Sequence, residues 1–381
     1  MSIFITGATG QTGSQLAEYL IETNKLGVSS PTDIICLVRD LKKADFLTKL
    51  GVQIEKGDLL DLKMLQSIMN KYDIENVFHF AANVNQCSTF QELFEPNCTG
   101  TTNMLDVFVS SQAKWFFYAS SISVYSGYLN KEKYQIFDES MPMGSIDHQK
   151  DNNYAVTKRI AENSVREYSK KYPKKNFIIN RLGPICGPRD RIIIPSFVKI
   201  LPYSIPKLIN KGKDTFSLTP TRDIARAVVF LTKFDNISGT AFNIVGVPVS
   251  YKEIFGYFSS YYNRKPLKIS IPHWLFKGFI PFLNVIRFIA KRNIMIQTIF
   301  SETALNYLGK SITYKTEKIQ DLGFEFKISV KEAITSGLIE LDPNRKLVKA
   351  NMKLKKEEKT KNKSNIFDFI RNFKKKISQK S

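Results

Sequence analysis

A glycine-rich loop near the start of the chain limits the fold more than any other feature. Residues 6–13 read TGATGQTG, which spaces Gly7, Gly10 and Gly13 three residues apart. A short apolar run precedes the loop, and residues 11–23 after it carry apolar residues at helical spacing. A glycine loop between a strand and a helix predicts a cradle for a phosphate group, and an ordinary tight turn is the alternative.

Each glycine has a separate expected role in such a cradle. Gly7 permits the sharp turn, Gly10 lets the backbone approach a pyrophosphate, and Gly13 lets the helix pack closely on the sheet. Free N–H groups and the positive end of the helix dipole would hold the anion. The loop residues that we expect to contact a dinucleotide are Gly7, Thr9, Gly10, Gln11, Thr12 and Gly13.

The first half of the chain alternates strand-like apolar runs with helical patterns. We expect strands at 3–6, 33–38, 52–55, 76–81, 115–119 and 176–181, and helices at 11–23, 41–50, 60–71, 96–111 and 154–172. This alternation predicts an α/β fold of the Rossmann type, a doubly wound parallel sheet with helices on both faces. After residue 183 the pattern loosens, which predicts a smaller, mainly C-terminal substrate lobe with a returning strand at 241–245. The predicted division is 1–180 for the nucleotide-binding domain, 181–343 for the substrate lobe and 344–381 for a tail.

The tail carries about half of the net charge of +21, because residues 344–381 hold fourteen Lys or Arg against three acidic residues. Its first part is rich in lysine and poor in apolar residues, which predicts disorder. Residues 365–380 place apolar residues mostly on one helical face with lysines opposite, which predicts peripheral contact with a membrane surface. Docking on the protein itself, binding a partner and a solvated tail are alternatives. No groove-reading motif is present, so we expect no specific nucleic-acid partner.

The cysteines and the apolar segments indicate the cellular compartment in which the protein is expected. Four scattered cysteines without a CxxC pair argue against a disulfide framework and a zinc site, and no metal is expected. The apolar run at the start is too short for a signal peptide, so we expect a cytoplasmic protein, at the inner face of the membrane if the tail binds lipid. Residues 271–300 are strongly apolar but interrupted by basic residues and a proline. We interpret them as core or pocket helices, with membrane contact as the alternative.

Two residues bear on which dinucleotide binds. Arg39 directly follows the second predicted strand, where an arginine pairs with a 2′-phosphate and an acidic residue would bind ribose hydroxyls. Arg39 therefore favours NADP and leaves NAD open, while a solvated arginine is the alternative. Asp58 follows the third strand, where a carboxylate can accept from the adenine amino group or cap a helix.

A tyrosine and a lysine four residues apart indicate proton-transfer chemistry. Tyr154 and Lys158 lie on one face of a predicted helix. A neighbouring ammonium stabilises a phenolate and lowers its pKa, so that the tyrosine can exchange a proton with a hydroxyl or carbonyl. The pair alone is common on protein surfaces. Further groups support it: a serine at the end of the fifth strand to polarise a carbonyl, and Asn97, expected near a helix start, to order a water.

Seven motifs together resemble the extended short-chain dehydrogenase/reductase family, the NAD(P)-dependent epimerase/dehydratase group. They are TGATGQTG, GDLLD, VFHFAANV, NCTGTTNML, YASSISVY, YAVTK and RLGPICGP, and the resemblance covers residues 1 to about 340. It implies a catalytic triad of Ser121, Tyr154 and Lys158 supported by Asn97. Ser120 and Ser123 are alternatives to Ser121, which a four-residue offset to Tyr125 selects.

The resemblance also implies residue roles and partners. Tyr154 would be the acid/base, Lys158 would bind the nicotinamide ribose and lower the tyrosine pKa, and hydride would pass between cofactor and substrate carbon. The implied cofactor contacts outside the glycine loop are Arg39, Asp58, Leu59, Ala81, Ala82, Asn83, Tyr154 and Lys158. A small-molecule substrate and a homodimer through two long helices, one carrying Tyr154, are also implied.

The motifs indicate the family more firmly than they indicate the branch within it. Residues 187–225 lack the glycine- and glutamine-rich stretch of many sugar-nucleotide members and look more like the hydroxysteroid dehydrogenase and dihydroflavonol reductase branch. We therefore expect an oxidoreductase acting on a hydroxyl or carbonyl of a bulky apolar substrate. A sugar-nucleotide epimerase or dehydratase that retains its cofactor is the alternative. A non-catalytic assembly or regulatory protein is a second one, against which the intact Ser/Tyr/Lys set argues.

Overall fold

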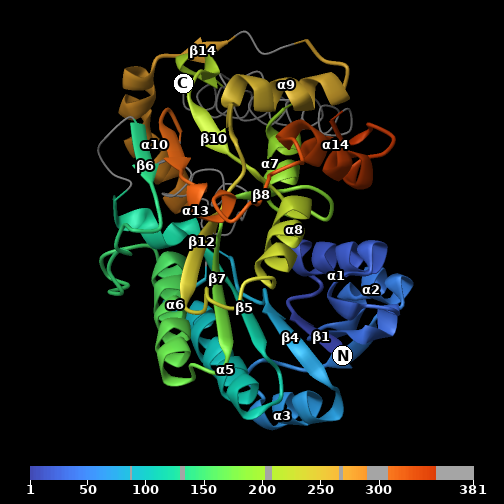
Figure 1. The fold of residues 1–381 in the computed structure, drawn as a ribbon. Coiled ribbons are helices and arrows are strands. Elements are labelled where there is room, and N and C mark those ends of the chain that lie inside the picture. The colour runs from blue at the N-terminus through green and yellow to red at the C-terminus, as the bar shows by residue number, and fades with distance from the viewer. Residues whose placement is uncertain (86–87, 129–133, 202–207, 266–268, 290–307, 349–381) are drawn as a thin grey trace, which may run out of the picture.

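A seven-stranded parallel sheet forms the centre of the molecule (Figure 1). The computed structural model describes residues 1–85, 88–128, 134–201, 208–265, 269–289 and 308–348. The order of strands is β3-β2-β1-β4-β5-β7-β12, and every neighbouring pair is parallel. The strands are β1 (Ser2–Thr6), β2 (Ile34–Val38), β3 (Gln53–Lys56), β4 (Ile74–His79), β5 (Trp115–Ser121), β7 (Asn176–Leu182) and β12 (Thr240–Ile244). The predicted Rossmann-type fold is confirmed.

Helices cover both faces of this sheet, and alternate residues of each strand pack against one layer or the other. The first layer holds α1 (Gln11–Thr23), α2 (Asp45–Leu50) and α8 (Thr221–Leu231); the second holds α3 (Leu62–Lys71), α5 (Gly100–Ser110) and α6 (Asn153–Lys171). In β5, Trp115 and Phe117 join the first apolar cluster, whereas Phe116 and Tyr118 join the second. Burial on both faces explains why these strands read as continuous apolar runs.

The chain beyond residue 182 builds a second lobe and then returns to the sheet. β12 pairs with β7 at the edge, and α8 packs against α1. The lobe has its own apolar cluster, formed mainly by α7 (Ile193–Ile200), α9 (Tyr251–Tyr261) and α14 (Val330–Leu341). Its two-stranded sheets pair β6 (Tyr134–Phe137) with β15 (Ser311–Tyr314), β8 (Ile185–Cys186) with β11 (Thr219–Pro220), β9 (Leu208–Ile209) with β14 (Ser270–Ile271), and β10 (Thr215–Ser217) with β13 (Pro248–Ser250). The exact domain limits stay a prediction.

Two predicted helices differ from the structure at their starts. The helix expected at 96–111 begins earlier, because α4 (Phe90–Phe94), a π-helical turn (Glu95–Thr99) and α5 follow one another without a break. Pro96 lies in the π turn, where the wider backbone tolerates a residue without an N–H donor. The segment expected at 41–50 divides into a 3₁₀ turn (Leu41–Lys43) and α2. Asn97 therefore lies inside a helical run and not near its start.

The apolar segment 271–300 also differs from its interpretation. Helix α10 covers His273–Ile289, and Trp274, Phe282 and Val285 on it are exposed. The prediction of a core or pocket helix is thus wrong for the outer face of α10. Residues 290–307 and the tail from 349 onward, including its predicted amphipathic helix, lie outside the described residues. Within the described ranges, no helix combines the length and apolar character needed to cross a membrane.

Candidate functional site

The glycine loop connects the end of β1 to the start of α1. Gly7 takes a left-handed backbone conformation with φ of 69°, and the Gly10 N–H donates to the Gly7 carbonyl at 2.9 Å. A Cβ on Gly7 would lie 2.5 Å from the Ala81 amide nitrogen. The loop therefore packs against the turn that follows β4, and only glycine fits at position 7.

The start of α1 suits an anion. Gly10 is the N-cap residue, and within the described chain no side chain caps this helix and no acidic residue lies in its first turn. The N–H groups of the first turn and the helix dipole are thus directed at the loop. A Cβ on Gly13 would lie 2.6 Å from the Gly7 carbonyl oxygen, so the helix approaches the loop closely. These residues fit the diphosphate of a dinucleotide.

The residues predicted for the adenosine end lie after β2 and β3. Arg39 is exposed, and its guanidinium lies 4.0 Å from the Asp58 carboxylate. Asp58 Oδ1 accepts the Leu60 N–H at 3.0 Å, whereas Asp61 caps α3. Asp58 therefore stabilises a turn before the helix and keeps its second oxygen toward Arg39. Leu59 is buried, and its carbonyl accepts from the Asn103 side chain at 2.8 Å.

The turn after β4 is held by a buried amide. Asn97 Oδ1 accepts the Asn83 N–H at 2.7 Å, and Asn97 Nδ2 donates to the Asn83 carbonyl at 3.0 Å and to Thr157 Oγ1 at 3.1 Å. Asn97 thus links the half-buried turn of Ala81, Ala82 and Asn83 to helix α6. Its part in a proton relay stays a prediction.

The predicted triad comes together at the end of β5 and the start of α6. Asn152 caps α6 by accepting the Tyr154 N–H at 3.0 Å, which makes Tyr154 the second residue of the helix. Ser121 is the last residue of β5, and its side chain shares a hydrogen bond with Tyr154. Lys158 is buried one turn along α6, and its Nζ donates to the Ala119 carbonyl at 2.7 Å.

Burial shifts the pKa values of both Tyr154 and Lys158. It raises the pKa of Tyr154 to about 12, although the hydrogen bond with Ser121 favours the phenolate. Burial also lowers the pKa of Lys158 to about 8, against the opposing influence of Cys98 and Glu162. The cost of burying a phenolate therefore opposes the lowering of the tyrosine pKa that is expected from Lys158, and that role of Lys158 stays a prediction.

The two alternative serines have other contacts. Ser120 Oγ donates to Glu162 Oε2 at 2.6 Å, on the opposite face of β5 from Ser121. The backbone N–H of Ser123 donates to Ser121 Oγ at 3.1 Å. Of these serines, Ser121 is therefore the one whose hydroxyl lies at Tyr154.

A buried ion-pair network lies beside the triad, and it was not predicted from the sequence. Glu162 follows Lys158 by one helical turn, and its Oε1 accepts from Arg181 Nη2 at 2.6 Å and from Arg166 Nη2 at 2.9 Å. The network ties α6 to β5 and β7, since Ser120 and Arg181 lie on these strands. The spacing of four between Tyr154, Lys158 and Glu162 was the available signal.

A second missed contact joins the substrate lobe to the glycine loop. Arg189 donates to Ser14 Oγ and to Glu18 Oε2, each at 2.8 Å, and Arg191 Nη2 donates to the Thr9 carbonyl at 3.1 Å. The segment after β8 therefore crosses the loop. Among the residues that the structure describes, no group of three His, Cys, Asp or Glu could hold a metal ion.

Comparison with known proteins agrees with this geometry. Residues 3–245 match the model of the NAD dependent epimerase/dehydratase family. The chain is 30% identical to the dTDP-D-glucose 4,6-dehydratase of Dictyostelium discoideum over 66% of its own length and 61% of the relative. It is 26% identical to the UDP-glucose 4-epimerase of Erwinia amylovora over 49% of its length and 54% of the relative. The chain thus spans under two thirds of these curated relatives.

Solved structures show the same fold. The UDP-glucose 4-epimerase of Thermotoga maritima superposes with a TM-score of 0.67 at 16% identity, over 90% of this chain and 99% of that one. The UDP-glucuronic acid 4-epimerase of Bacillus cereus, solved in complex with NAD, superposes with a TM-score of 0.66 at 19% identity, over 90% of this chain and 96% of that one.

Proposed function

Since the chain belongs to the NAD dependent epimerase/dehydratase family, we propose that it is an NAD(P)-dependent enzyme that interconverts a secondary hydroxyl and a ketone. The observation that carries this proposal is the meeting of Ser121, Tyr154 and Lys158 at the carboxyl edge of the sheet that holds the glycine loop. That loop leaves β1, and the triad lies two strands away at the end of β5. Ligands of open α/β sheets bind at this edge.

Ser121, Tyr154 and Lys158 each have a separate role in the proposed reaction. When bound, the nicotinamide cofactor would supply the hydride acceptor or donor. As a phenolate, Tyr154 takes the proton of the substrate hydroxyl during oxidation, and as the phenol so formed it returns that proton to the substrate oxygen during reduction. Its place in the first turn of α6 favours the phenolate through the helix dipole. Ser121 holds the substrate oxygen beside it, and the Lys158 ammonium provides positive charge on the same helical face.

The carboxylates nearest to the triad in sequence favour simple redox or epimerase chemistry over dehydration. Elimination of water needs a further base for a C–H proton and an acid for the leaving hydroxyl. Asp151 is paired with Arg159 at 2.7 Å and accepts from Ser126, and Glu162 is bound by Arg181. Neither is free for that role.

For the substrate we propose a sugar nucleotide, with the cofactor retained between half-reactions. Similarity to a dTDP-D-glucose dehydratase and to UDP-glucose epimerases supports this class. A bulky apolar alcohol or ketone is the second candidate, favoured by the composition of residues 187–225. Pocket helices at residues 271–300 would also have suited an apolar substrate, but the exposed apolar side chains of α10 do not point inward.

For the cofactor we propose NADP, because the exposed Arg39 at the end of β2 can pair with a 2′-phosphate. NAD is the alternative, and it is bound in the Bacillus cereus relative. Fluorescence titration with NADPH and NADH tests the choice. Preference for NADPH should collapse in Arg39→Ala; equal NADH affinity in both proteins would contradict it.

The remaining partners follow from the family resemblance and the tail composition. We propose a homodimer through α5 and α6, which light scattering tests by its mass. We also propose that the basic tail contributes to peripheral membrane contact at the inner face of the membrane. Vesicle flotation of the intact chain and of a chain ending at Pro343 tests the tail; equal flotation would contradict it.

Product analysis tests the function itself. Purified protein is incubated with dTDP-glucose or UDP-glucose and oxidised nucleotide, and products are followed by NMR. A 4-epimer without net formation of reduced nicotinamide supports the epimerase reading. In a parallel incubation with NADPH and an apolar ketone, net reduction of the ketone supports the second candidate. Tyr154→Phe should abolish either product, whereas Tyr128→Phe, at an exposed tyrosine, should not. Nucleotide binding without turnover of any substrate would favour a non-catalytic protein.

A further inference from the structure

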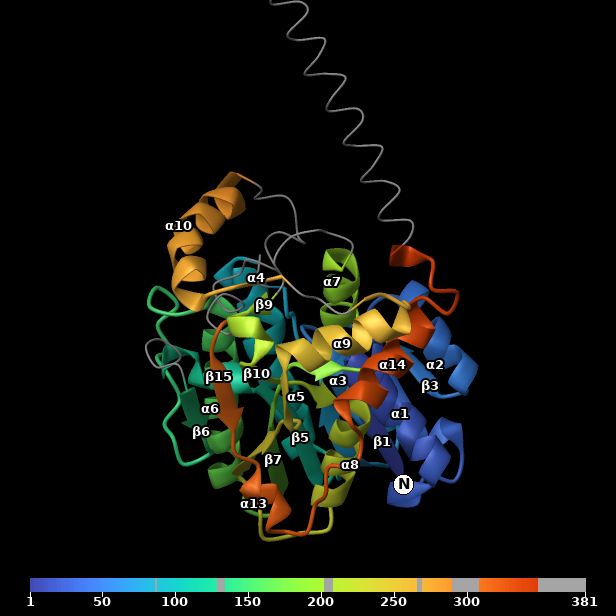
Figure 2. The ribbon, with the colours of Figure 1, turned by 90° about the horizontal axis from the view of Figure 1, so that it is seen from above.

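Helix α10 presents large apolar side chains to the outside. Figure 2 shows it at the rim of the substrate lobe, projecting away from the sheet. Trp274 is 73% exposed, Phe282 60% and Val285 53%. Phe276, in contrast, is buried and fastens the start of the helix to the lobe. Large aromatic and aliphatic side chains of α10 are therefore exposed to water.

These side chains form one face and not a scatter. Successive residues of a helix turn by about 100°, which places Trp274, Val285 and Phe282 within an arc of about 80° and Phe279 about 60° beyond it. The buried Phe276 lies on the opposite side. Contiguous exposed apolar patches of this kind mark interaction sites.

The surroundings of this face are basic. Exposed lysines lie on α10 and beside its start, among the residues that the structure describes. Lys277 on α10 is exposed, and together with burial it lowers the pKa of Lys310, so the two ammonium groups lie close to each other.

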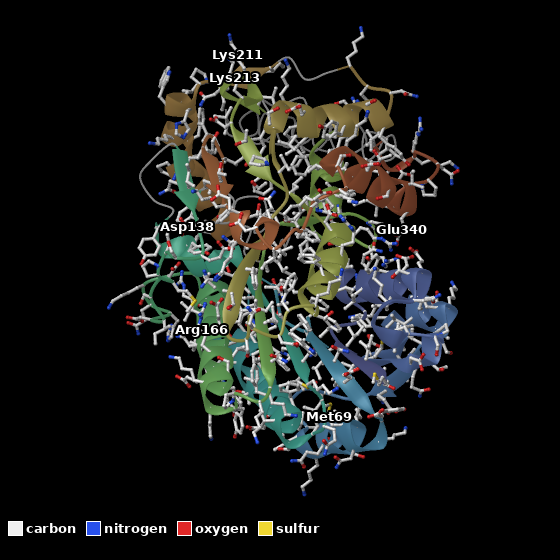
Figure 3. The ribbon with its side chains drawn as sticks, in the orientation of Figure 1. Met69, Asp138, Arg166, Lys211, Lys213 and Glu340 are labelled. Carbon is white, nitrogen blue, oxygen red and sulfur yellow. The ribbon has the colours of Figure 1, made fainter. Side chains whose placement is uncertain are left out.

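Two further lysines lie beside the start of α10. Figure 3 labels Lys211 and Lys213 at the outer end of the lobe, and both are exposed. The Lys211 N–H donates to Ser270 Oγ at 2.7 Å, and the neighbouring Asn210 Oδ1 accepts the His273 N–H at 3.0 Å. The lysine turn and the helix start are thus held together by two hydrogen bonds.

We propose that the outer face of α10, with the lysines that flank it, binds the surface of an anionic lipid bilayer. The aromatic rings would enter the boundary between head groups and acyl chains, and the lysines would meet the negative head groups. A second copy of the chain is a poorer occupant, because two such faces would bring lysines of like charge together.

This inference is independent of the proposed reaction, since Ser121, Tyr154 and Lys158 lie on other elements. It also differs from contact through the tail, because it rests on a helix of the folded lobe. An acidic protein surface is the rival occupant, and the experiment below separates it from lipid.

Tryptophan fluorescence reports on α10 directly. The chain has two tryptophans, Trp115, buried in β5, and Trp274, exposed on α10. Vesicles of phosphatidylcholine with phosphatidylglycerol and brominated lipid should quench Trp274, and added salt should reduce the effect. Trp274→Phe should remove the quenching while vesicle flotation persists. Flotation without quenching in the native chain would place the contact elsewhere and overturn the proposal.

Matched variants of the full chain test the affinity. Phe279→Ser with Phe282→Ser should weaken flotation with phosphatidylglycerol vesicles at least tenfold. The control, Val247→Ser with Ile339→Ser, removes apolar side chains of similar exposure away from α10 and should change nothing. Unchanged flotation of the α10 variant would overturn the proposal, as would complete loss on replacing Lys374, Lys375 and Lys376 by alanine. Failure of the native chain to bind any vesicle would overturn it in favour of a protein partner.

Discussion

Tyr154 lies under opposing influences at the residue scale. Burial favours the neutral phenol, whereas the hydrogen bond from Ser121 and the first turn of α6 favour the phenolate. Lys158, with a pKa lowered to about 8, can lose its own proton near the upper physiological range. The site therefore holds two groups whose proton occupancy responds to what binds beside them.

The two adjacent serines give a matched pair of variants. Ser121→Ala removes the hydroxyl at Tyr154 and should slow turnover by about 10² with little loss of stability. Ser120→Ala removes the hydrogen bond to Glu162 and should cost about 1 kcal/mol of unfolding free energy with little effect on turnover. Rate measurements and denaturant titration of both variants check this. The reverse pattern would place the functional serine at position 120.

Lys158 predicts a pH dependence of stability. Its pKa is about 8 in the fold against an ordinary 10.5, so between these values the unfolded chain holds a proton that the folded chain has lost. The free energy of unfolding attributable to this group therefore rises with pH, by at most about 1.4 kcal/mol per pH unit. Denaturant titrations of the native chain and Lys158→Met from pH 7.5 to about 10 should diverge accordingly. Parallel profiles would contradict the lowered pKa.

At the scale of elements, the glycine loop connects β1 to α1 and packs against the turn that follows β4. β1 ends at Thr6, whose hydroxyl contacts His79 Nδ1 at 2.7 Å at the end of β4, and Gly7 then turns against the Ala81 backbone. His79 Nε2 lies 3.0 Å from Thr101 Oγ1 on α5. The carboxyl edge of the sheet is thus fixed by contacts that run from strand to strand and into the second helix layer.

Two glycines with nearly equal positive φ, one in the glycine loop and one outside it, distinguish backbone strain from steric crowding. Gly7 and Gly27 have φ of 69° and 72°, but a Cβ on Gly27 would meet no atom within 4 Å. Gly27→Ala should cost about 1–2 kcal/mol from backbone strain alone. Gly7→Ala should cost clearly more and abolish dinucleotide binding. Thermal unfolding and nucleotide titration measure both; equal costs would show that the Ala81 contact is unimportant.

At the scale of the whole molecule, local patterns predicted most of the sheet. Strands buried on both faces are continuous apolar runs, so their limits were placed within about two residues. The positions of Ser121, Tyr154 and Lys158 followed from the family resemblance, which placed the tyrosine and lysine one helical turn apart and the serine at a strand end. Their catalytic roles stay a prediction. The contacts of Arg181 and Arg189 were not predictable, because their partners Glu162 and Glu18 are distant in sequence.

The substrate lobe was less predictable for a physical reason. An apolar segment such as α10 has the same sequence pattern whether its side chains face the core or the solvent. Their direction is set by packing against the rest of the molecule, which the sequence of the segment does not encode. The lobe nevertheless closes on the nucleotide-binding half, where Arg189 and Arg191 contact α1 and the glycine loop. A site between these two halves is what the proposed reaction requires.

Single-turnover absorbance with Tyr154→Phe tests the central claim most directly. Native protein with oxidised nucleotide is mixed with UDP-glucose, dTDP-glucose or an apolar secondary alcohol, and the near-ultraviolet band of reduced nicotinamide is followed. We predict that one of these substrates produces the band and that Tyr154→Phe slows its appearance by at least about 10²-fold while nucleotide affinity is kept. A band that forms equally fast in Tyr154→Phe would contradict the assignment of Tyr154 as the acid/base.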